Sequence, residues 1–324
     1  MIVTLTANPS LDRTVTLAGP LAPGEVQAAV SAREDAGGKG INVARVAAAA
    51  GERAVAVLPL SPEDPFHTVL RATGIPARAV PVAGHVRSNI AITDPRGETT
   101  KLNLPGAELS AAERAALIEA VVTASAGARW LVLAGSVPPG AGDDLYVDVI
   151  AATRGRWGAH APRIAVDTSG PALAAVVADA HPDLIKPNDD ELAALLDDDA
   201  ARDADPASLV AAARRFVPTR VGAALITLGS AGALLVTADG AWIGRPPPIR
   251  PVSTVGAGDS SLAGYLLADL DGAEESTRLA TAIRYGAAAA SLPGTQAPTH
   301  ADLPVDEIPI SSLPAPASVP LTDH

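Results

Sequence analysis

Strand-like and helix-like segments alternate along much of the chain, and this alternation limits the fold more than any other feature of the sequence. Short runs rich in Val, Ile and Leu are each followed by a longer segment with the apolar spacing of a helix. Such alternation is typical of parallel strands whose connecting helices cover both faces of a sheet. We therefore predict an α/β fold, a three-layer αβα sandwich around a central, mainly parallel sheet. The strands are expected at Trp130–Ala134, Arg163–Asp167, Leu184–Lys186 and Ala223–Leu228, and the helices near Asp143–Thr153, Pro171–Ala178, Asp189–Leu196 and Pro206–Phe216.

The flanking sequence adds elements at both ends. A helix is expected from Ser110, because Ser110 and Glu113 have the spacing of a capping box. The proline-rich tail after about Pro304 is expected to be irregular in part. Further strands are predicted at Ile2–Thr6, Ala54–Leu58, Ala233–Thr237 and Ala241–Gly244, and further helices at Gly40–Gly51, Ser110–Thr123, Asp259–Leu270 and Glu274–Ser291.

Three strand-like segments do not fit the alternation. They lie around residues 11–17, 27–35 and 87–104, and in the last of them two alternating runs flank the turn sequence Asp94–Gly97, which predicts a hairpin. We expect a small separate sheet, built from about residues 11–35 and 85–105. A small sheet beside a larger α/β body suggests a lid over a cleft.

Charge and composition exclude several classes of function. The chain has 36 acidic and 24 basic residues and a net charge of −12, which argues against a general nucleic-acid binder. It has no cysteine, hence no disulfide framework and no thiolate metal site, and its six histidines lack the spacing of zinc ligands. We find no apolar run of bilayer length and no basic start typical of a signal peptide, so we expect a cytoplasmic protein without membrane contact.

The three lysines are informative because the other 21 basic residues are arginines. Lys39, Lys101 and Lys186 all fall within the motifs described below or within the predicted lid segments. Lysine supplies a compact point charge for phosphate, whereas arginine supplies a planar fork. Chance placement of three residues is the alternative.

The segment Ser253–Ser260 joins a loop to a helix and has the properties of an anion site. Its small residues Gly256, Ala257 and Gly258 allow backbone amides to converge at the helix N-terminus. Asp259, in the first turn, could accept a proton from an attacking hydroxyl group. Alternatively, Asp259 is an ordinary acidic residue at a helix start, where the helix dipole favours it.

The segment Lys186–Glu191 follows a predicted buried strand. Asn188 and Glu191 are three residues apart, so they lie on one face of the first helical turn, where their oxygens could hold Mg²⁺ beside nucleotide phosphates. The same spacing also fits a capping box, and both interpretations can hold together.

Two further glycine-rich loops suggest that two anions bind. Thr227–Gly232 suits close approach to a phosphate or sugar, and Gly37–Asn42 opens a helix with glycines, Lys39 and an amide. Neither is a P-loop, and the dinucleotide fingerprint after the first strand is missing, which argues against a nucleotide-dependent oxidoreductase. We expect one site for a nucleotide and one for a phosphorylated substrate. Asp12, Arg87 and Lys101 belong to the predicted lid, where charged side chains are often merely solvated.

Six motifs in sequence order resemble those of the PfkB/ribokinase-like carbohydrate kinases, and the resemblance covers nearly the whole chain. It implies a ribokinase-like fold, a single kinase domain over residues 1–324, ATP and Mg²⁺ as cofactors, and a homodimer formed through the lid sheets. The motifs are Asn8–Asp12, Gly37–Asn42, Gly135–Gly140, Lys186–Glu191, Thr227–Gly232 and Thr254–Asp259.

The resemblance also implies roles for individual residues. Asp259 would be the catalytic base, with Gly256, Ala257 and Gly258 as the anion hole. The sugar and its phosphate would be bound by Asp12, Gly38, Lys39, Asn42, Arg87, Lys101 and Ser136. The nucleotide would be bound by Lys186, Asn188, Thr227, Gly229, Ser230, Ala231, Gly232 and Gly258. Magnesium would be bound by Asn188 and Glu191.

The expected substrate is fructose 1-phosphate, phosphorylated at its C6 hydroxyl. Lys39 between glycines, together with Glu25, resembles the pattern of kinases that act on fructose 1-phosphate. Kinases of tagatose 6-phosphate share the glycine–lysine pattern, so tagatose 6-phosphate is an alternative substrate. Fructose 6-phosphate is another. The family's usual Gly-Ser-Leu-Pro reads Gly-Ser-Val-Pro at Gly135–Pro138, which should leave the role of Ser136 intact. A non-catalytic regulator is less favoured, because it would be expected to lack Asp259 or the magnesium residues.

Overall fold

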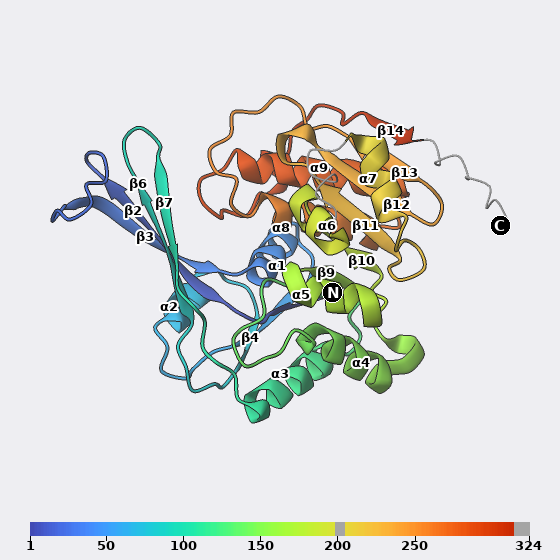
Figure 1. The fold of residues 1–324 in the computed structure, drawn as a ribbon, viewed down its shortest axis with the longest axis horizontal. Coiled ribbons are helices and arrows are strands. Elements are labelled where there is room, and N and C mark those ends of the chain that lie inside the picture. Colours follow the sequence, from blue (N-terminus) through green and yellow to red (C-terminus); the bar gives the residue numbers. More distant parts are fainter. Residues whose placement is uncertain (198–204, 314–324) are drawn as a thin grey trace.

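The computed structural model describes residues 1–197 and 205–313 and contains a large and a small β-sheet (Figure 1). Within these ranges, no helix is long and apolar enough to cross a membrane. The strands of the large sheet are β1 (Ile2–Thr6), β4 (Ala54–Pro59), β5 (Ala77–Val80), β8 (Trp130–Ala134), β9 (Arg163–Asp167), β10 (Leu184–Ile185), β11 (Ala223–Thr227), β12 (Ala233–Thr237), β13 (Ala241–Gly244) and β14 (Ile310–Leu313); the helices are α1 (Lys39–Ala49), α2 (Phe66–Ala72), α3 (Ala111–Ala124), α4 (Leu145–Trp157), α5 (Gly170–Asp179), α6 (Asp189–Leu196), α7 (Pro206–Ala213), α8 (Ala257–Leu270) and α9 (Glu275–Ala290).

The large sheet has the order β14-β13-β12-β11-β10-β9-β8-β1-β4-β5. Pairing is parallel from β11 to β5 and antiparallel from β11 to β14. The predicted mainly parallel sheet is confirmed. Because the carboxyl ends of all parallel strands meet at one edge, that edge is where a ligand cleft is expected.

Helices cover both faces of this sheet. On β1, Val3 and Leu5 pack into the hydrophobic core on the side of α3 to α7, whereas Ile2 packs into the second core with α1, α8 and α9. All five residues of β1 are buried. Burial on both faces explains why the strands read as continuous apolar runs without a polar face.

The small sheet has the order β3-β2-β6-β7 and projects away from the body (Figure 1). Its central pair, β2 (Ser10–Leu17) and β6 (Arg87–Thr93), is parallel, and β3 (Ala29–Gly37) and β7 (Thr99–Asn103) are antiparallel edges. The predicted β6–β7 hairpin is confirmed. Asp94 stabilises its turn by accepting hydrogen bonds from the backbone amides of Arg96 (2.8 Å) and Glu98 (3.0 Å).

The structure differs from the sequence prediction at several elements. Helix α2 and strand β5 were not predicted, and α7 ends at Ala213 rather than Phe216. In the proline-rich tail, β14 pairs with β13 as an edge strand, because an edge partner can supply backbone hydrogen bonds to a short segment. The rest of that tail, residues 314–324, lies outside the described residues.

Candidate active site

A cleft with a volume of about 1010 Å³ lies at the carboxyl edge of the parallel strands and reaches the inner ends of β2 and β6. It is lined by the N-termini of α1, α6 and α8, by the loop after β11 and by the segment before α8. A single cleft therefore brings together the glycine-rich motifs that are far apart in the sequence.

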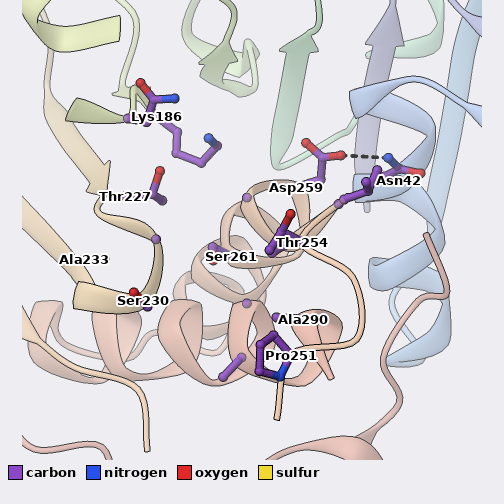
Figure 2. A pocket seen from close by; sticks show the side chains of 18 of the residues that line it. Asn42, Lys186, Thr227, Ser230, Ala233, Pro251, Thr254, Asp259, Ser261 and Ala290 are labelled. Atoms are coloured by element: carbon purple, nitrogen blue, oxygen red, sulfur yellow. Dashed lines mark hydrogen bonds between the residues drawn. The ribbon is translucent and has the colours of Figure 1, made fainter. Parts of the chain in front are cut away.

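Asp259 is the acidic residue at the start of α8 and is only 6% exposed. The turn before the helix requires Gly256, whose φ of 80° is in the left-handed region that side chains other than glycine disfavour. Ala257 and Gly258 form the first turn and line the cleft, and the first backbone amides of a helix have no partner within the helix. Asn42 of α1 donates a hydrogen bond from Nδ2 to Asp259 Oδ2 at 2.7 Å, as Figure 2 shows. The combination of a carboxylate and amide donors is what a kinase needs for its acceptor hydroxyl and transferred phosphoryl group.

The environment of Asp259 raises its pKa to about 6. Burial is the main cause, and the negative charge of Asp167 adds to it, whereas the Asn42 hydrogen bond, Lys39 and Lys186 act in the opposite direction. A base with a pKa near the working pH accepts a proton readily and can still be deprotonated in the resting enzyme.

Asp167, at the carboxyl end of β9, has no solvent exposure and was not among the predicted site residues. Its Oδ1 lies 2.6 Å from Lys39 Nζ, and its Oδ2 lies 3.2 Å from Lys186 Nζ. Burial would raise the pKa of Asp167, but Lys186 and Lys39 outweigh it and hold the pKa below the usual value. A charged residue at the end of a predicted buried strand is the sequence signal that could have identified it.

Asn188 and Glu191 form the capping box of α6. Glu191 N donates to Asn188 Oδ1 at 2.7 Å, and Asn188 N donates to Glu191 Oε2 at 3.0 Å. The free oxygen, Glu191 Oε1, lies 4.0 Å from Lys39 Nζ. In the described part of the chain, no three acidic or histidine side chains form a metal cluster. A magnesium ion that keeps its waters and binds nucleotide phosphates needs only one or two carboxylates, so Glu191 fits such an ion.

The inner end of the small sheet supplies polar side chains to the same cleft. Asp12 Oδ1 accepts hydrogen bonds from Ser10 Oγ (2.7 Å) and from Asn89 Nδ2 (2.9 Å). Asn89, which was not predicted, lies opposite Asp12 in the parallel β2–β6 register. Arg87 also lines this end and donates from Nε to the backbone oxygen of Asn8 at 3.4 Å.

The other end of the cleft has a more apolar wall. Figure 2 shows Thr227 near Lys186 and Ser230 further along the same side, with Ala290 and Pro251 across from Ser230. The six-motif pattern did not predict this wall. It is completed by three prolines before α8 and by apolar and small residues of α9: Pro246, Pro247, Pro248, Ile283, Gly286 and Ala287. A flat ring such as a nucleotide base fits between such surfaces.

The cleft collects most of the predicted site residues. Those that line it are Asp12, Gly38, Lys39, Asn42, Arg87, Lys186, Asn188, Glu191, Thr227, Gly229, Ser230, Gly232, Gly256, Ala257, Gly258 and Asp259.

Three predicted residues do not line it. Lys101 is exposed on the edge strand β7, so the structure does not bring the three lysines together. Ser136 accepts a hydrogen bond from Asn8 Nδ2 at 3.2 Å outside the cleft lining, and Ala231 lies between two lining residues, Ser230 and Gly232, without lining it.

Comparison with known proteins places this site in a family. The model for pfkB family carbohydrate kinases matches residues 6–304. The chain is 37% identical over 289 residues to 1-phosphofructokinase of Xanthomonas campestris pv. campestris, covering 86% of this chain and 88% of that protein. It is 33% identical over 306 residues to ATP-dependent 6-phosphofructokinase isozyme 2 of Escherichia coli, covering 93% and 96%. The tetrameric inhibited form of phosphofructokinase-2 from Escherichia coli superposes with a TM-score of 0.83 at 31% identity, covering 93% and 96%.

Proposed function

The chain belongs to the pfkB family of carbohydrate kinases, and on this premise we propose that it phosphorylates fructose 1-phosphate at its C6 hydroxyl. As a family member it is a phosphotransferase that acts on an alcohol group, as predicted. The single observation that carries the proposal is a buried carboxyl group, Asp259, with its pKa raised to about 6, at the start of α8 in a cleft of about 1010 Å³.

We assign the transfer step to the groups that meet around Asp259. The C6 oxygen attacks the γ-phosphorus of ATP, the bond from that phosphorus to the bridging oxygen of ADP breaks, and the hydroxyl proton passes to Asp259. The amides at Gly256–Gly258 take up charge on the transferred group. The products are fructose 1,6-bisphosphate and ADP.

Each end of the cleft receives one ligand in this proposal. Asp12, held by Ser10 and Asn89, accepts hydrogen bonds from sugar hydroxyls, and Arg87 pairs with the existing phosphate. The apolar wall near Pro251 and Ala290 holds the adenine ring. Gly38, Lys39 and Asn42, which also line the cleft, would surround the sugar and its phosphate.

Magnesium belongs to the proposal as well. Bound beside Glu191 and Asn188, the ion would neutralise charge on the nucleotide phosphates. The Glu191 carboxylate would orient it, while the capping hydrogen bonds keep both side chains in place.

The identity of the phosphosugar is the most specific part of the proposal. Two relatives named 1-phosphofructokinase are 37% identical to this chain, whereas the 6-phosphofructokinase isozyme 2 and the 1-phosphofructokinase of Escherichia coli are 33% and 32% identical. The two higher identities favour fructose 1-phosphate. Coupled ADP assays with fructose 1-phosphate, fructose 6-phosphate and tagatose 6-phosphate test this choice. We expect the highest kcat/KM with fructose 1-phosphate; a higher value with either of the others would reassign the substrate.

Two expectations stay predictions. The homodimer through the small sheets is one, because the similar Escherichia coli structure is described as a tetramer in an inhibited form. Light scattering of the purified protein with and without ATP measures the assembly. The cytoplasmic location is the other, and fractionation of the source cells tests it.

A further inference from the structure

Asp167 has no part in the reaction as proposed so far, although it is among the most deeply buried ionised groups near the cleft. It lies at the end of β9, behind the cleft surface, and does not line the cleft. Its two oxygens hold two different lysines, Lys39 at 2.6 Å and Lys186 at 3.2 Å. Both lysines do line the cleft.

The two lysines come from separate parts of the fold. Lys39 is the first residue of α1, and Lys186 directly follows β10. Two ammonium groups that enter one pocket repel each other, and a carboxylate buried alone is strongly disfavoured. Sharing one carboxylate removes both penalties and holds each ammonium at a defined place.

These places flank the reacting groups. An ideal Cβ placed on Gly258 would lie 3.3 Å from Lys186 Nζ, so this ammonium touches the first turn of α8. Both lysines act on the charge of Asp259 and lower its pKa. Lys39 also lies 4.0 Å from Glu191 Oε1, so it is near the predicted magnesium residue and not only near the sugar end.

We propose, on the basis of the kinase function above, that Asp167 is a positioning residue that fixes Lys39 and Lys186 on either side of the transferred phosphoryl group. Asp167 holds both ammonium groups from the side away from the cleft, in the positions that they occupy during phosphoryl transfer. The lysines therefore do not reorganise when negative charge develops on the transferred group. Because Asp167 competes with bound phosphates for both ammonium groups, it weakens ground-state binding while it favours the transfer step.

The substitution Asp167→Asn keeps the size of the side chain and removes its charge. We expect kcat to fall by about 10²- to 10³-fold, the loss seen when a preorganised donor is removed. KM for either substrate should stay the same or fall, because phosphates then take both ammonium groups without competition. By calorimetry, ADP without Mg²⁺ should bind several-fold more tightly to the variant than to the wild type. Asp167→Glu, which restores the charge, should recover part of kcat.

Asp269→Asn is the matched control. Asp269 is also a buried carboxylate shared by two cations, Arg163 and Arg278, but it lies at the far end of α8 from the cleft. This variant should lower the unfolding temperature and leave kcat, KM and ADP affinity unchanged.

Three results would overturn the proposal. The first is a parallel rise of both KM values with a loss of thermal stability like that of Asp269→Asn, which would make Asp167 structural. The second is recovery of kcat by excess Mg²⁺, which would place Asp167 on the metal instead of the lysines. The third is unchanged or weaker ADP binding. If the wild type phosphorylates none of the three phosphosugars, the proposed function fails, but the ADP measurement still tests the lysine positions.

Discussion

Asp259 combines a chemical advantage with a cost in stability. Its pKa is raised to about 6, chiefly by burial, so the folded protein binds this proton more tightly than the unfolded chain does. At pH 7, above both pKa values, the folded protein must carry a buried charge. This loss of folding stability is absent below pH 3.8, the pKa of the carboxyl group in the unfolded chain. It develops as the pH rises towards 6, the pKa in the folded protein.

The variant Asp259→Asn should therefore lose activity and gain stability. We expect kcat to fall by about 10²- to 10⁴-fold, because the general base is lost. At pH 7 the gain in unfolding free energy should be at most about 3 kcal/mol, from the difference in pKa. Thermal unfolding and steady-state rates measure both. Near-normal turnover would remove Asp259 from its assigned role.

The pH profile provides a second test at this residue. Only the ionised form of Asp259 accepts a proton, so kcat/KM should fall as the pH drops through about 6. Lys39 lowers this pKa, and its removal in Lys39→Met should move the acid limb to higher pH. Arg71→Met, at an exposed position on α2, is the control and should not move it. An acid limb at the same pH in wild type and Lys39→Met would contradict the electrostatic account.

At the scale of elements, the packing of α8 against α9 determines where Asp259 lies. Gly264 of α8 allows close contact: a Cβ there would lie 2.7 Å from Thr281 O and 2.9 Å from Tyr285 Cβ of α9. Backbone atoms cannot move aside as a flexible side chain can. The two helices can approach this closely only with glycine at this position.

The substitution Gly264→Ala should thus destabilise the protein by about 1 to 3 kcal/mol, as overpacking does. It should also reduce kcat, because α8 carries Asp259. Gly155→Ala is the matched control, since Gly155 is also inside a helix, α4, but has no atom within 4 Å of an added Cβ. That change should stabilise the protein by about 0.4 to 1 kcal/mol. Chemical denaturation compares the two, and equal effects would refute the packing argument.

At the scale of the whole molecule, the small sheet is the element that we predict to act as a lid. Only its inner end, with Ser10, Asp12, Arg87 and Asn89, contributes to the cleft, and the rest projects from the body (Figure 1). Closure of this sheet over bound ligands would exclude water and protect ATP from hydrolysis.

Amide hydrogen exchange measures this closure. With fructose 1-phosphate and a non-hydrolysable ATP analogue together, exchange should slow in β2 and β6 more than with either ligand alone. The central strand β8, buried in the body, should exchange equally in all samples. Unchanged exchange in β2 and β6 with both ligands would show that the small sheet is no lid.

Much of the fold and many site residues could be predicted because they depend on short-range patterns. Strand and helix periods, the capping boxes at Ser110 and Asn188, and the glycine-rich helix start at Gly256 each involve only a few neighbouring residues. Those patterns are present in the sequence as it stands.

Tertiary structure decided the contacts between distant segments. Lys39 meets Asp167 across 128 residues, and Asn89 meets Asp12 across 77, because the strand order and the β2–β6 register place them together. No local propensity encodes which strands become neighbours; that follows from burying the apolar faces of the whole chain at once. For the same reason Lys101, a lid residue that was expected to bind the sugar phosphate, lies on the edge strand β7 instead of in the cleft.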